Sequence, residues 1–301
     1  MTVLIDNNAI TDPAVNQALE EYCLNEVAPH RSCVILYVND PVVVVGKHQC
    51  VFAEVDLTVA QREGIRVIRR VSGGGSVYHD GGNLNFSFVS AFDRTRFGNY
   101  TECLKPVVRA LGDLGIQATQ GGKSDLHING LKISGNAQYA NTRSMLIHGT
   151  LLFDADTHRL RSVLSASAPV IAARGVPSIR SAVTRIRDHL PSDMNMVGFV
   201  RSVRNSLSRY LPIDHCESLT PPQWEAIYRI ADEKYRRWAW NIGRSPWCRL
   251  RVPVAGEEGP DMVVDINGGI IQGVESTAGG RDMENWIGRR FEDLLCAVDV
   301  A

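Results

Sequence analysis

The chain reads Arg69-Arg70-Val71-Ser72-Gly73-Gly74-Gly75-Ser76-Val77-Tyr78-His79-Asp80-Gly81-Gly82-Asn83-Leu84-Asn85-Phe86 from residue 69 to residue 86. Three adjacent glycines cost backbone entropy, so they are usually kept where the main chain approaches a ligand too closely for any Cβ. Two guanidiniums precede the glycines, and backbone N–H groups in a turn form a concavity for an anion. The stretch therefore predicts an anion-binding loop. The alternative is a flexible hairpin turn beside a solvated arginine pair.

The residue pattern on both sides of this loop predicts alternating helices and strands. Helices are expected at residues 13–22, 55–63 and 100–114, and strands at residues 34–38, 42–45, 65–70 and 83–90. The first helix has Asp12 as a good N-cap and Pro13 at its first position. The strands are continuous β-branched runs between turn residues, which indicates burial. This order predicts a mixed α/β fold.

The composition is that of an ordinary globular protein of 301 residues, with 44% hydrophobic residues, 22% charged residues and a formal net charge of -1. This length allows one large domain or a large and a small one. A nucleic-acid surface would normally show a basic excess, so we expect no nucleic-acid partner. Seven scattered cysteines without a Cys-x-x-Cys motif indicate reduced thiols. Without a signal peptide or a membrane-spanning run, the sequence predicts a cytoplasmic protein with no membrane partner.

A second cluster lies at residues 122–138. It contains Asn129-Gly130, a dipeptide typical of a two-residue hairpin turn. On the strand after this turn, Leu131 and Ile133 are expected to face the core. Lys132 and Ser134 would then face the opposite side, where Lys132 is either a solvated edge charge or part of a polar pocket. The small and amide residues after Ser134 favour the pocket.

A third cluster is the strand-like run at residues 147–153, which contains His148-Gly149-Thr150. A histidine at such a position is more often a structural hydrogen-bonding group than a catalyst. No arrangement for a Ser-His-Asp triad is evident, and the spacing of the histidines does not indicate a metal site.

Several motifs, in order, closely resemble those of the lipoate-protein ligases, a family of the biotin/lipoate ligase superfamily. They are the sequence at residues 69–83, the Asp125-Leu126 pair, the Lys132-Ile133-Ser134-Gly135-Asn136-Ala137-Gln138 run and the His148-Gly149-Thr150-Leu151-Leu152 run. Further likeness lies at residues 40–49, 175–184 and 238–243. The resemblance implies a class II synthetase-like catalytic domain at residues 1–243, with mixed sheets and packed helices. Strands expected at residues 247–254, 262–266 and 270–274 and a helix expected at residues 282–298 indicate a small α+β accessory lobe at residues 247–301. The resemblance implies that this lobe closes over the active site, and the alternative is that it only caps the large domain.

The function that this resemblance implies is a two-step acyl transfer. The carboxylate of lipoate attacks the α-phosphate of ATP, which releases pyrophosphate and leaves lipoyl-AMP. A lysine of an acceptor lipoyl domain then attacks this mixed anhydride. The implied acceptors are E2 subunits of 2-oxoacid dehydrogenases, the glycine cleavage H protein or similar proteins, and the implied state is a monomer. Lys132 matches the essential lysine of the family, and a fixed cation there would stabilise the charge that develops in both steps.

The resemblance also assigns binding residues. The residues expected to bind ATP or lipoyl-AMP are Arg70, Ser72, Gly73, Gly74, Gly75, Ser76, Val77, Tyr78, His79, Asn83, Asp125, Lys132, Ser134, Gly135, Ala137 and His148. Backbone groups near Val77 and Tyr78 would meet the adenine. His79, Asp80 and Asn83 either touch the ligand or hold the loop in shape. Asp125 is the expected contact of Mg²⁺, which would arrive with ATP because the ion prefers oxygen ligands and phosphates.

One departure from the family pattern keeps other functions open. The family usually has Arg-Asn where this chain has Lys123-Ser124, and a serine lacks the separate donor and acceptor of an amide. A lipoyl or octanoyl transferase that uses a preactivated acyl group is therefore an alternative, with Cys50 or Cys103 as its nucleophile. A non-catalytic lipoate-binding protein is another alternative. Biotin ligase is a weaker one, because the Gly-Arg-Gly-Arg string of that family is absent.

Overall fold

The computed structural model describes residues 1–122, 124–166, 168–190, 193–253, 262–276 and 283–297. The chain forms two compact units, each assembled from three stretches of sequence. Unit 1 contains Met1–Pro41, His79–Thr157 and Arg180–Tyr235, and unit 2 contains Val42–Tyr78, His158–Ile179 and Arg236–Ala301.

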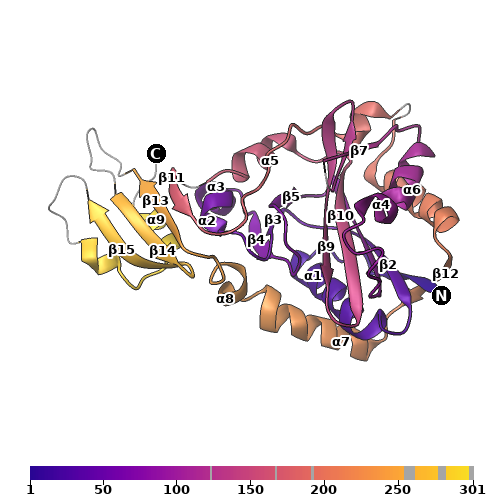
Figure 1. The fold of residues 1–301 in the computed structure, drawn as a ribbon, viewed down its shortest axis with the longest axis horizontal. Coiled ribbons are helices and arrows are strands. Elements are labelled where there is room, and N and C mark those ends of the chain that lie inside the picture. The colour runs from indigo at the N-terminus through magenta and orange to yellow at the C-terminus, as the bar shows by residue number, and fades with distance from the viewer. Residues whose placement is uncertain (123, 167, 191–192, 254–261, 277–282, 298–301) are drawn as a thin grey trace. The chain divides into compact units, whose positions relative to one another are not determined.

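Unit 1 is built on one mixed sheet of eight strands. In sheet order the strands are β12 (Ile213–Ser218), β1 (Thr2–Asp6), β2 (Ser32–Val38), β6 (Asn83–Ala91), β10 (Ser144–Leu152), β9 (Leu131–Ala140), β8 (Asp125–Ile128) and β7 (Thr119–Gly121). The helices are α1 (Pro13–Tyr22), η1 (Cys23–Val27), α4 (Tyr100–Gly112), η2 (Ile186–His189), α6 (Met196–Tyr210), α7 (Pro221–Ile230) and η3 (Ala231–Tyr235). β9 and β10 are long neighbouring strands in Figure 1, and their antiparallel register pairs Ala137 with His148.

The two faces of this sheet differ in chemistry because successive strand residues point to opposite sides. Phe86 and Ile147 belong to an apolar cluster with residues of α4 and α6. Their sequence neighbours Ser87 and His148 instead bond to Glu20 of α1. The sheet therefore has an apolar face toward α4 and α6 and a buried polar network toward α1.

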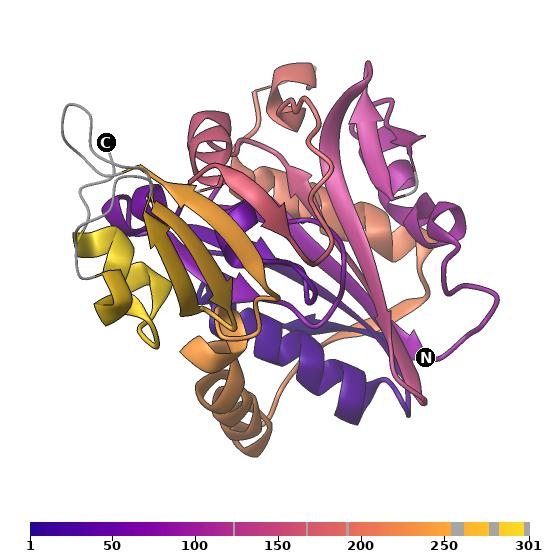
Figure 2. The same ribbon diagram turned by 60° about the vertical axis from the view of Figure 1, so that its left-hand side comes forward.

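Unit 2 contains two smaller sheets. The first has the order β4 (Arg66–Arg69), β3 (Val42–Val45) and β5 (Val77–His79), and the second has the order β11 (Val170–Ala173), β13 (Cys248–Val252), β14 (Met262–Asn267) and β15 (Ile270–Ser276). The helices are α2 (Val51–Glu54), α3 (Leu57–Arg62), α5 (Thr157–Val163), α8 (Trp238–Asn241), η4 (Met283–Trp286) and α9 (Phe291–Ala297). The C-terminal strands and α9, coloured orange to yellow, lie together in Figure 2.

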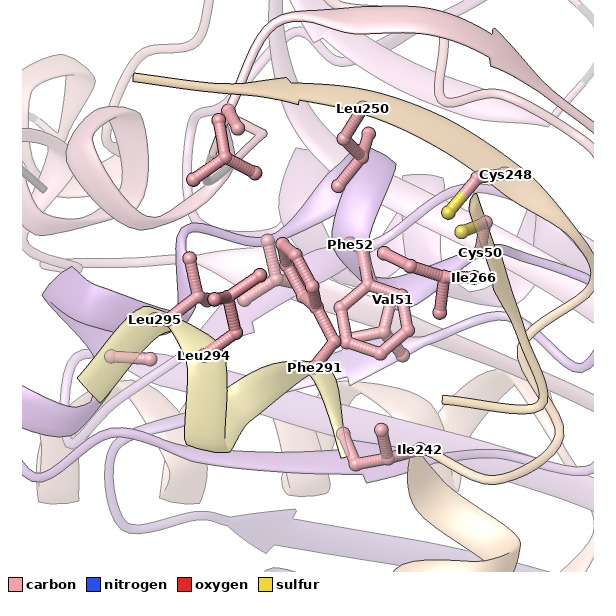
Figure 3. Packing of buried hydrophobic residues seen from close by; sticks show 14 of the residues in the cluster. Cys50, Val51, Phe52, Ile242, Cys248, Leu250, Ile266, Phe291, Leu294 and Leu295 are labelled. Atoms are coloured by element: carbon pink, nitrogen blue, oxygen red, sulfur yellow. The ribbon is translucent and has the colours of Figure 1, made fainter. Parts of the chain in front are cut away.

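One apolar cluster joins the early and late segments of unit 2. Phe52 of α2 packs edge-on against Phe291 of α9, with 5.2 Å between the ring centroids. Leu250 and Ile266 of the C-terminal sheet belong to the same cluster (Figure 3). Val43 of β3 belongs to it as well. Residues from the predicted catalytic domain and from the predicted accessory lobe thus share one core. The lobe itself stays a prediction.

Most of the predicted elements are confirmed. The helices at residues 13–22 and 100–114 and the strands at residues 34–38, 42–45, 65–70 and 83–90 match elements of the structure within a few residues. The prediction for residues 55–63 is met by the shorter helix α3. The segments not predicted include β1, α6 and α7. A mixed α/β fold is confirmed.

Two local predictions are wrong. A single helix was expected at residues 282–298, but the described part of this segment forms η4 and α9, because Gly288 between them has a φ of 85°. Residues 282 and 298 lie outside the described part. Leu131 was expected to face the core, yet its exposed fraction is 37% because it lies at the end of the hairpin, whereas Ile133 is buried.

Within the described residues, no helix has the length and apolar character that a membrane crossing requires.

Candidate active site

The side chain of Arg70 holds the glycine loop together from inside. Its exposed fraction is 5%, and its guanidinium donates to the carbonyl oxygens of Gly73 (2.6 Å) and Gly75 (2.8 Å). The same group donates to Ser72 Oγ (2.9 Å) and to the carbonyl oxygen of Val44 (3.0 Å). Arg70 thus fixes the curvature of the loop and places a positive charge directly beneath it.

Gln49 also holds the glycine loop in place through hydrogen bonds. The sequence analysis did not predict this role. The side chain of Gln49 is fully buried, and Oε1 accepts hydrogen bonds from Gly46 N (2.8 Å) and Ser76 Oγ (2.9 Å). Its Nε2 donates to Ser178 Oγ (3.0 Å), which also accepts from Ser76 N (2.9 Å). The amide therefore joins three backbone segments. A glutamine within a loop gives no sequence signal of this role.

The arginine pair divides into two structural roles. Arg69 is fully buried, and its guanidinium donates to the carbonyl oxygens of Gly46 (2.9 Å) and Gln49 (2.8 Å) and to those of Trp240 and Asn241 (both 3.2 Å). Arg69 therefore has a structural role, and Arg70 is the member of the pair that lies in the glycine loop.

Two glycines of unit 2 test how the loop is packed. A Cβ on Gly46 would lie 2.0 Å from the carbonyl oxygen of Gly74, whereas a Cβ on Gly73 would meet no protein atom within 4 Å. We expect Gly46→Ala to destabilise the protein by about 1–3 kcal/mol, because the backbone must move apart. Gly73→Ala is the matched control and should leave the thermal midpoint unchanged. Equal midpoints for the two variants in thermal unfolding would contradict this packing.

Lys132 lies on β9 in unit 1 and is paired on both sides. Its backbone N–H donates to the carbonyl oxygen of Ala182 (2.9 Å), its own carbonyl accepts from Thr184 N (3.0 Å), and β8 lies on its other edge. Its Nζ is 2.9 Å from Oδ2 of Asp125, and the exposed fractions of the two side chains are 20% and 25%. This placement favours the pocket over the solvated edge charge.

The turn before Lys132 has the predicted geometry. Asn129 and Gly130 have φ values of 50° and 80°, as a two-residue hairpin turn requires. A register shift between Leu126 and His127 changes the simple alternation, and Ser134 is fully buried instead of sharing the half-exposed side of Lys132.

Amides and hydroxyls line the strand after Lys132. Asn136 Nδ2 donates to the carbonyl oxygen of Ser124 (2.6 Å) and to Ser134 Oγ (3.1 Å). Gly135 N donates to Thr150 Oγ1 (3.2 Å). These bonds hold Ser124, the described half of the unusual Lys123-Ser124 pair, against β9. Lys123 lies outside the described residues.

His148 is oriented by a buried carboxylate that the sequence analysis missed. Its Nδ1 is 2.9 Å from Oε2 of Glu20, whose exposed fraction is 1%. Glu20 also accepts hydrogen bonds from Tyr37 OH (2.9 Å), Ser87 Oγ and Gln17 Nε2 (3.2 Å). Burial raises the pKa of Glu20, but His148 and the hydrogen bonds of Ser87 and Tyr37 outweigh this effect and lower the pKa from its ordinary value. In the sequence, Gln17 and Glu20 lie one turn apart, but Asn16 and Glu21 of the same helix are polar too, so the pair did not stand out.

The His79–Asn83 turn is held by its own side chains. Asp80 accepts hydrogen bonds from Gly82 N (2.9 Å) and Asp156 N (2.8 Å) through its two carboxylate oxygens. Asn39 Nδ2 lies 3.0 Å from Nδ1 of His79, and Asn83 Nδ2 donates to Asn85 (3.0 Å). These bonds favour the shape-holding role for Asp80. Ligand contacts of His79 and Asn83 stay predictions.

The predicted site residues fall into two groups, one in each unit. Unit 2 holds Arg70, Ser72, Gly73, Gly74, Gly75, Ser76, Val77 and Tyr78, and unit 1 holds His79, Asn83, Asp125, Lys132, Ser134, Gly135, Ala137 and His148. Within unit 1, pairing of β8, β9 and β10 brings together the residues from Asp125 to His148. Within unit 2, Arg70 and Gln49 organise the loop at residues 72–78.

The described residues form no metal cluster, and both candidate nucleophiles are buried. No three His, Cys, Asp or Glu side chains gather as a metal site in the described part of the chain. Asp125 offers a single carboxylate. Cys50 and Cys103, the candidate nucleophiles of a transferase, have exposed fractions of 3% and 1%. Burial raises the pKa of Cys103, which disfavours its thiolate.

Comparisons with known proteins agree on one family. The family described as the lipoyl protein ligase A/B catalytic domain matches residues 12–208. Lipoate-protein ligase LplJ of Bacillus subtilis is 39% identical over 276 residues, which cover 90% of this chain and 82% of that protein. Lipoate-protein ligase 1 of Staphylococcus aureus is 38% identical, with 80% of this chain and 74% of that protein covered.

Two solved structures share the fold. One is a bipartite lipoate protein ligase from Thermoplasma acidophilum, described with its E2 lipoyl domain. Its TM-score is 0.69 at 26% identity, and the match covers 84% of the present chain and 99% of the compared chain. A lipoate-protein ligase A bound with ATP has a TM-score of 0.67 at 26% identity, with 81% and 97% covered.

Proposed function

The chain belongs to the lipoyl protein ligase A/B family and is a lipoate-protein ligase, and we propose how its residues carry out the reaction. The carboxylate of lipoate attacks the α-phosphate of ATP, pyrophosphate leaves, and lipoyl-AMP is formed. The amine of an acceptor lysine then attacks the acyl carbon, and AMP leaves. Both steps develop negative charge on phosphate or carbonyl oxygens, so each requires a fixed positive charge close to the reacting atoms.

The placement of Lys132 is the observation that carries this proposal. Its Nζ is held 2.9 Å from Asp125, and its backbone is bonded on both edges. A compact ammonium group with three donors can bridge an α-phosphate oxygen and a carbonyl oxygen. Asp125 orients this group through the ion pair. Lys132 is the proposed catalytic residue.

The glycine loop is proposed to bind the phosphates and the nucleotide. The charge of Arg70 lies beneath the loop, and open space surrounds the position that a Cβ of Gly73 would occupy. The residues at 72–78 therefore present backbone groups toward a ligand, while the side chain of Tyr78 packs into the core of unit 2. On this proposal, Gly73→Ala weakens lipoyl-AMP binding although it leaves the fold intact.

The residues that β9 and β10 bring together are proposed to hold the acyl group. His148, oriented by Glu20, lies opposite Ala137 in the strand register, and Gly135 lies two residues before Ala137. Mg²⁺ is proposed to arrive with ATP, and Asp125 fits it as one carboxylate, since this ion needs only one or two carboxylates besides the phosphates. When bound, the ion would offset phosphate charge.

The partner is proposed to be a lipoyl domain. The bipartite Thermoplasma acidophilum ligase is described together with its E2 lipoyl domain, and the match covers 99% of the compared chain of that structure. E2 subunits and the glycine cleavage H protein remain the proposed acceptors. A monomeric state, a cytoplasmic location and an accessory lobe at residues 247–301 are likewise proposed. A thiol-dependent transferase is not favoured, because both candidate cysteines are buried.

A single assay tests the proposed function. We expect purified protein with lipoate, Mg²⁺ and ATP to release one pyrophosphate for each lipoyl group that appears on an apo lipoyl domain, as measured by intact mass. Preformed lipoyl-AMP, supplied in a parallel reaction without ATP, should give the same product. This reaction measures only the transfer of the lipoyl group to the acceptor. Acceptor modification from lipoyl-AMP but not from lipoate and ATP would contradict adenylation. Such a result would point to the Lys123-Ser124 replacement. No modification in either case would leave a lipoate-binding protein.

A further inference from the structure

Cys50 and Cys248 lie side by side in the core of unit 2, although they come from distant parts of the sequence. Cys50 directly precedes α2, and Cys248 is the first residue of β13. Figure 3 shows their sulfur atoms next to each other, in the same cluster as Phe52 and Ile266. Their exposed fractions are 3% and 0%, and both are free thiols. The proposed ligase reaction uses neither of them.

A buried cation lies beside this pair. The guanidinium of Arg69 is fully buried, and the hydrogen bonds described above all go to neutral carbonyl oxygens, with one further bond to Ser245 Oγ (3.3 Å). Burial lowers the pKa of Arg69 to about 10, and the nearby sulfur of Cys50 counteracts this effect. A buried positive charge surrounded by neutral acceptors favours an anion close by.

The two thiols differ in acidity. A hydrogen bond from Cys248 lowers the pKa of Cys50 against the effect of burial, and the charge of Arg69 lowers it further. The same hydrogen bond, together with burial, raises the pKa of Cys248. Cys50 is therefore the nucleophilic member of the pair, and Cys248 is the hydrogen-bond donor beside it.

A second buried pair in unit 1 provides a contrast. Cys23 and Cys33 also share a hydrogen bond, and both are buried. Their neighbours are the carboxylates of Glu20 and Glu217, which raise the pKa of Cys23 together with that hydrogen bond and burial. Because the pKa of Cys23 is raised, its thiolate is disfavoured, and this pair should react less readily than Cys50 and Cys248.

We propose that Cys50 and Cys248 are a redox modification site that a small hydroperoxide converts into an intrachain disulfide. The Cys50 thiolate attacks one oxygen of hydrogen peroxide, which forms the S–O bond of a sulfenic acid and releases hydroxide, and this takes a proton from solvent. The Cys248 thiolate then attacks the sulfur of Cys50 and displaces hydroxide, which takes the proton that Cys248 has lost. In total, two thiols and one peroxide give one disulfide and two waters.

The burial of both sulfurs selects the oxidant. A bulky disulfide such as oxidised glutathione cannot reach a thiol with an exposed fraction of 3%, whereas hydrogen peroxide is close to water in size. Because Gln49 precedes Cys50 and grips the loop at Gly46 and Ser76, the disulfide would join the base of the glycine loop covalently to β13. The site itself does not depend on the proposed ligase activity.

The experiment uses the full chain with the exposed thiols removed by Cys216→Ser and Cys296→Ser. After hydrogen peroxide treatment, we expect the intact mass to fall by about 2 Da, the two hydrogens lost to a disulfide, and dithiothreitol to reverse the change. A non-reducing digest should yield a peptide that joins Cys50 to Cys248. A disulfide between Cys23 and Cys33 instead would overturn the proposal. So would free thiols at Cys50 and Cys248 in protein whose surface methionines are already oxidised.

Two further substitutions identify the attacking sulfur. In the same background, Cys248→Ser should stop at a sulfenic acid on Cys50 that dimedone traps, and the matched Cys33→Ser should still form the bridge. A dimedone adduct on Cys248 in a Cys50→Ser protein, with none on Cys50 in the Cys248→Ser protein, would overturn the assignment. If a variant does not fold, the digest of the background protein still decides whether the disulfide forms.

Discussion

Replacement of Lys132 by alanine is expected to lower the rate of lipoyl-AMP formation about 10²–10³-fold, the usual loss when one preorganised donor to a developing oxyanion is removed. The rate of transfer from preformed lipoyl-AMP should fall as well, because the same ammonium group serves both steps. Pyrophosphate release measures the first step, and the mass of the acceptor measures the second. The fold should survive, since Ala182 and Thr184 bond to the backbone of residue 132 and not to its side chain.

The controls for this prediction come from the same chain. Lys105 also pairs with a carboxylate, that of Glu102, but half of its side chain is exposed on α4, so Lys105→Ala should retain full activity. Lys132→Arg keeps the charge but replaces a compact ammonium with a planar fork, and only part of the activity should remain. Unchanged adenylation by folded Lys132→Ala protein would remove Lys132 from the chemistry and leave it a structural partner of Asp125.

The hairpin that carries Lys132 could be predicted from the sequence. The Asn129-Gly130 turn fixes how β8 and β9 pair, so the proximity of Asp125 and Lys132 follows from a hairpin of a few residues. Leu131 shows the limit of this reasoning. Strict alternation would bury it, but the end of a hairpin has no second layer to cover it, and its side chain is partly exposed.

The long-range part of the site could not be predicted. Glu20 and His148 are separated by 128 positions, and Gln49 and Ser178 by 129. Such contacts depend on how distant segments pack, and no periodicity within one segment encodes them. The two arginines before the glycines illustrate the same limit. They are adjacent and identical in type, yet strand alternation directs Arg69 toward Asn241 and Arg70 into the glycine loop.

Replacement of Glu20 by alanine should cause the largest loss of stability, about 3–5 kcal/mol, because each buried donor left without its acceptor costs about 1–3 kcal/mol. Tyr37, Ser87 and His148 would each lose the acceptor that their hydrogen bonds now reach. Urea unfolding at pH 7 measures the effect. Glu102→Ala is the matched control, since that carboxylate is half exposed and its loss should change little. Equal stabilities of the two variants would contradict the described network.

The dependence of this loss on pH identifies its cause. The pKa of Glu20 in the folded protein lies below 4.5, its ordinary value, so folding favours the ionised form. The resulting stabilisation is fully present above pH 4.5 and is lost as the pH falls through the lower, folded pKa. Glu20→Gln removes this charge but keeps the shape of the side chain. The stability difference between wild type and Glu20→Gln should therefore be constant from pH 6 to pH 7 and shrink below about pH 4.5. A difference that stays constant through the acid range would show that Glu20 stabilises the fold by packing alone, and His148 would then lack a charged partner that fixes its orientation.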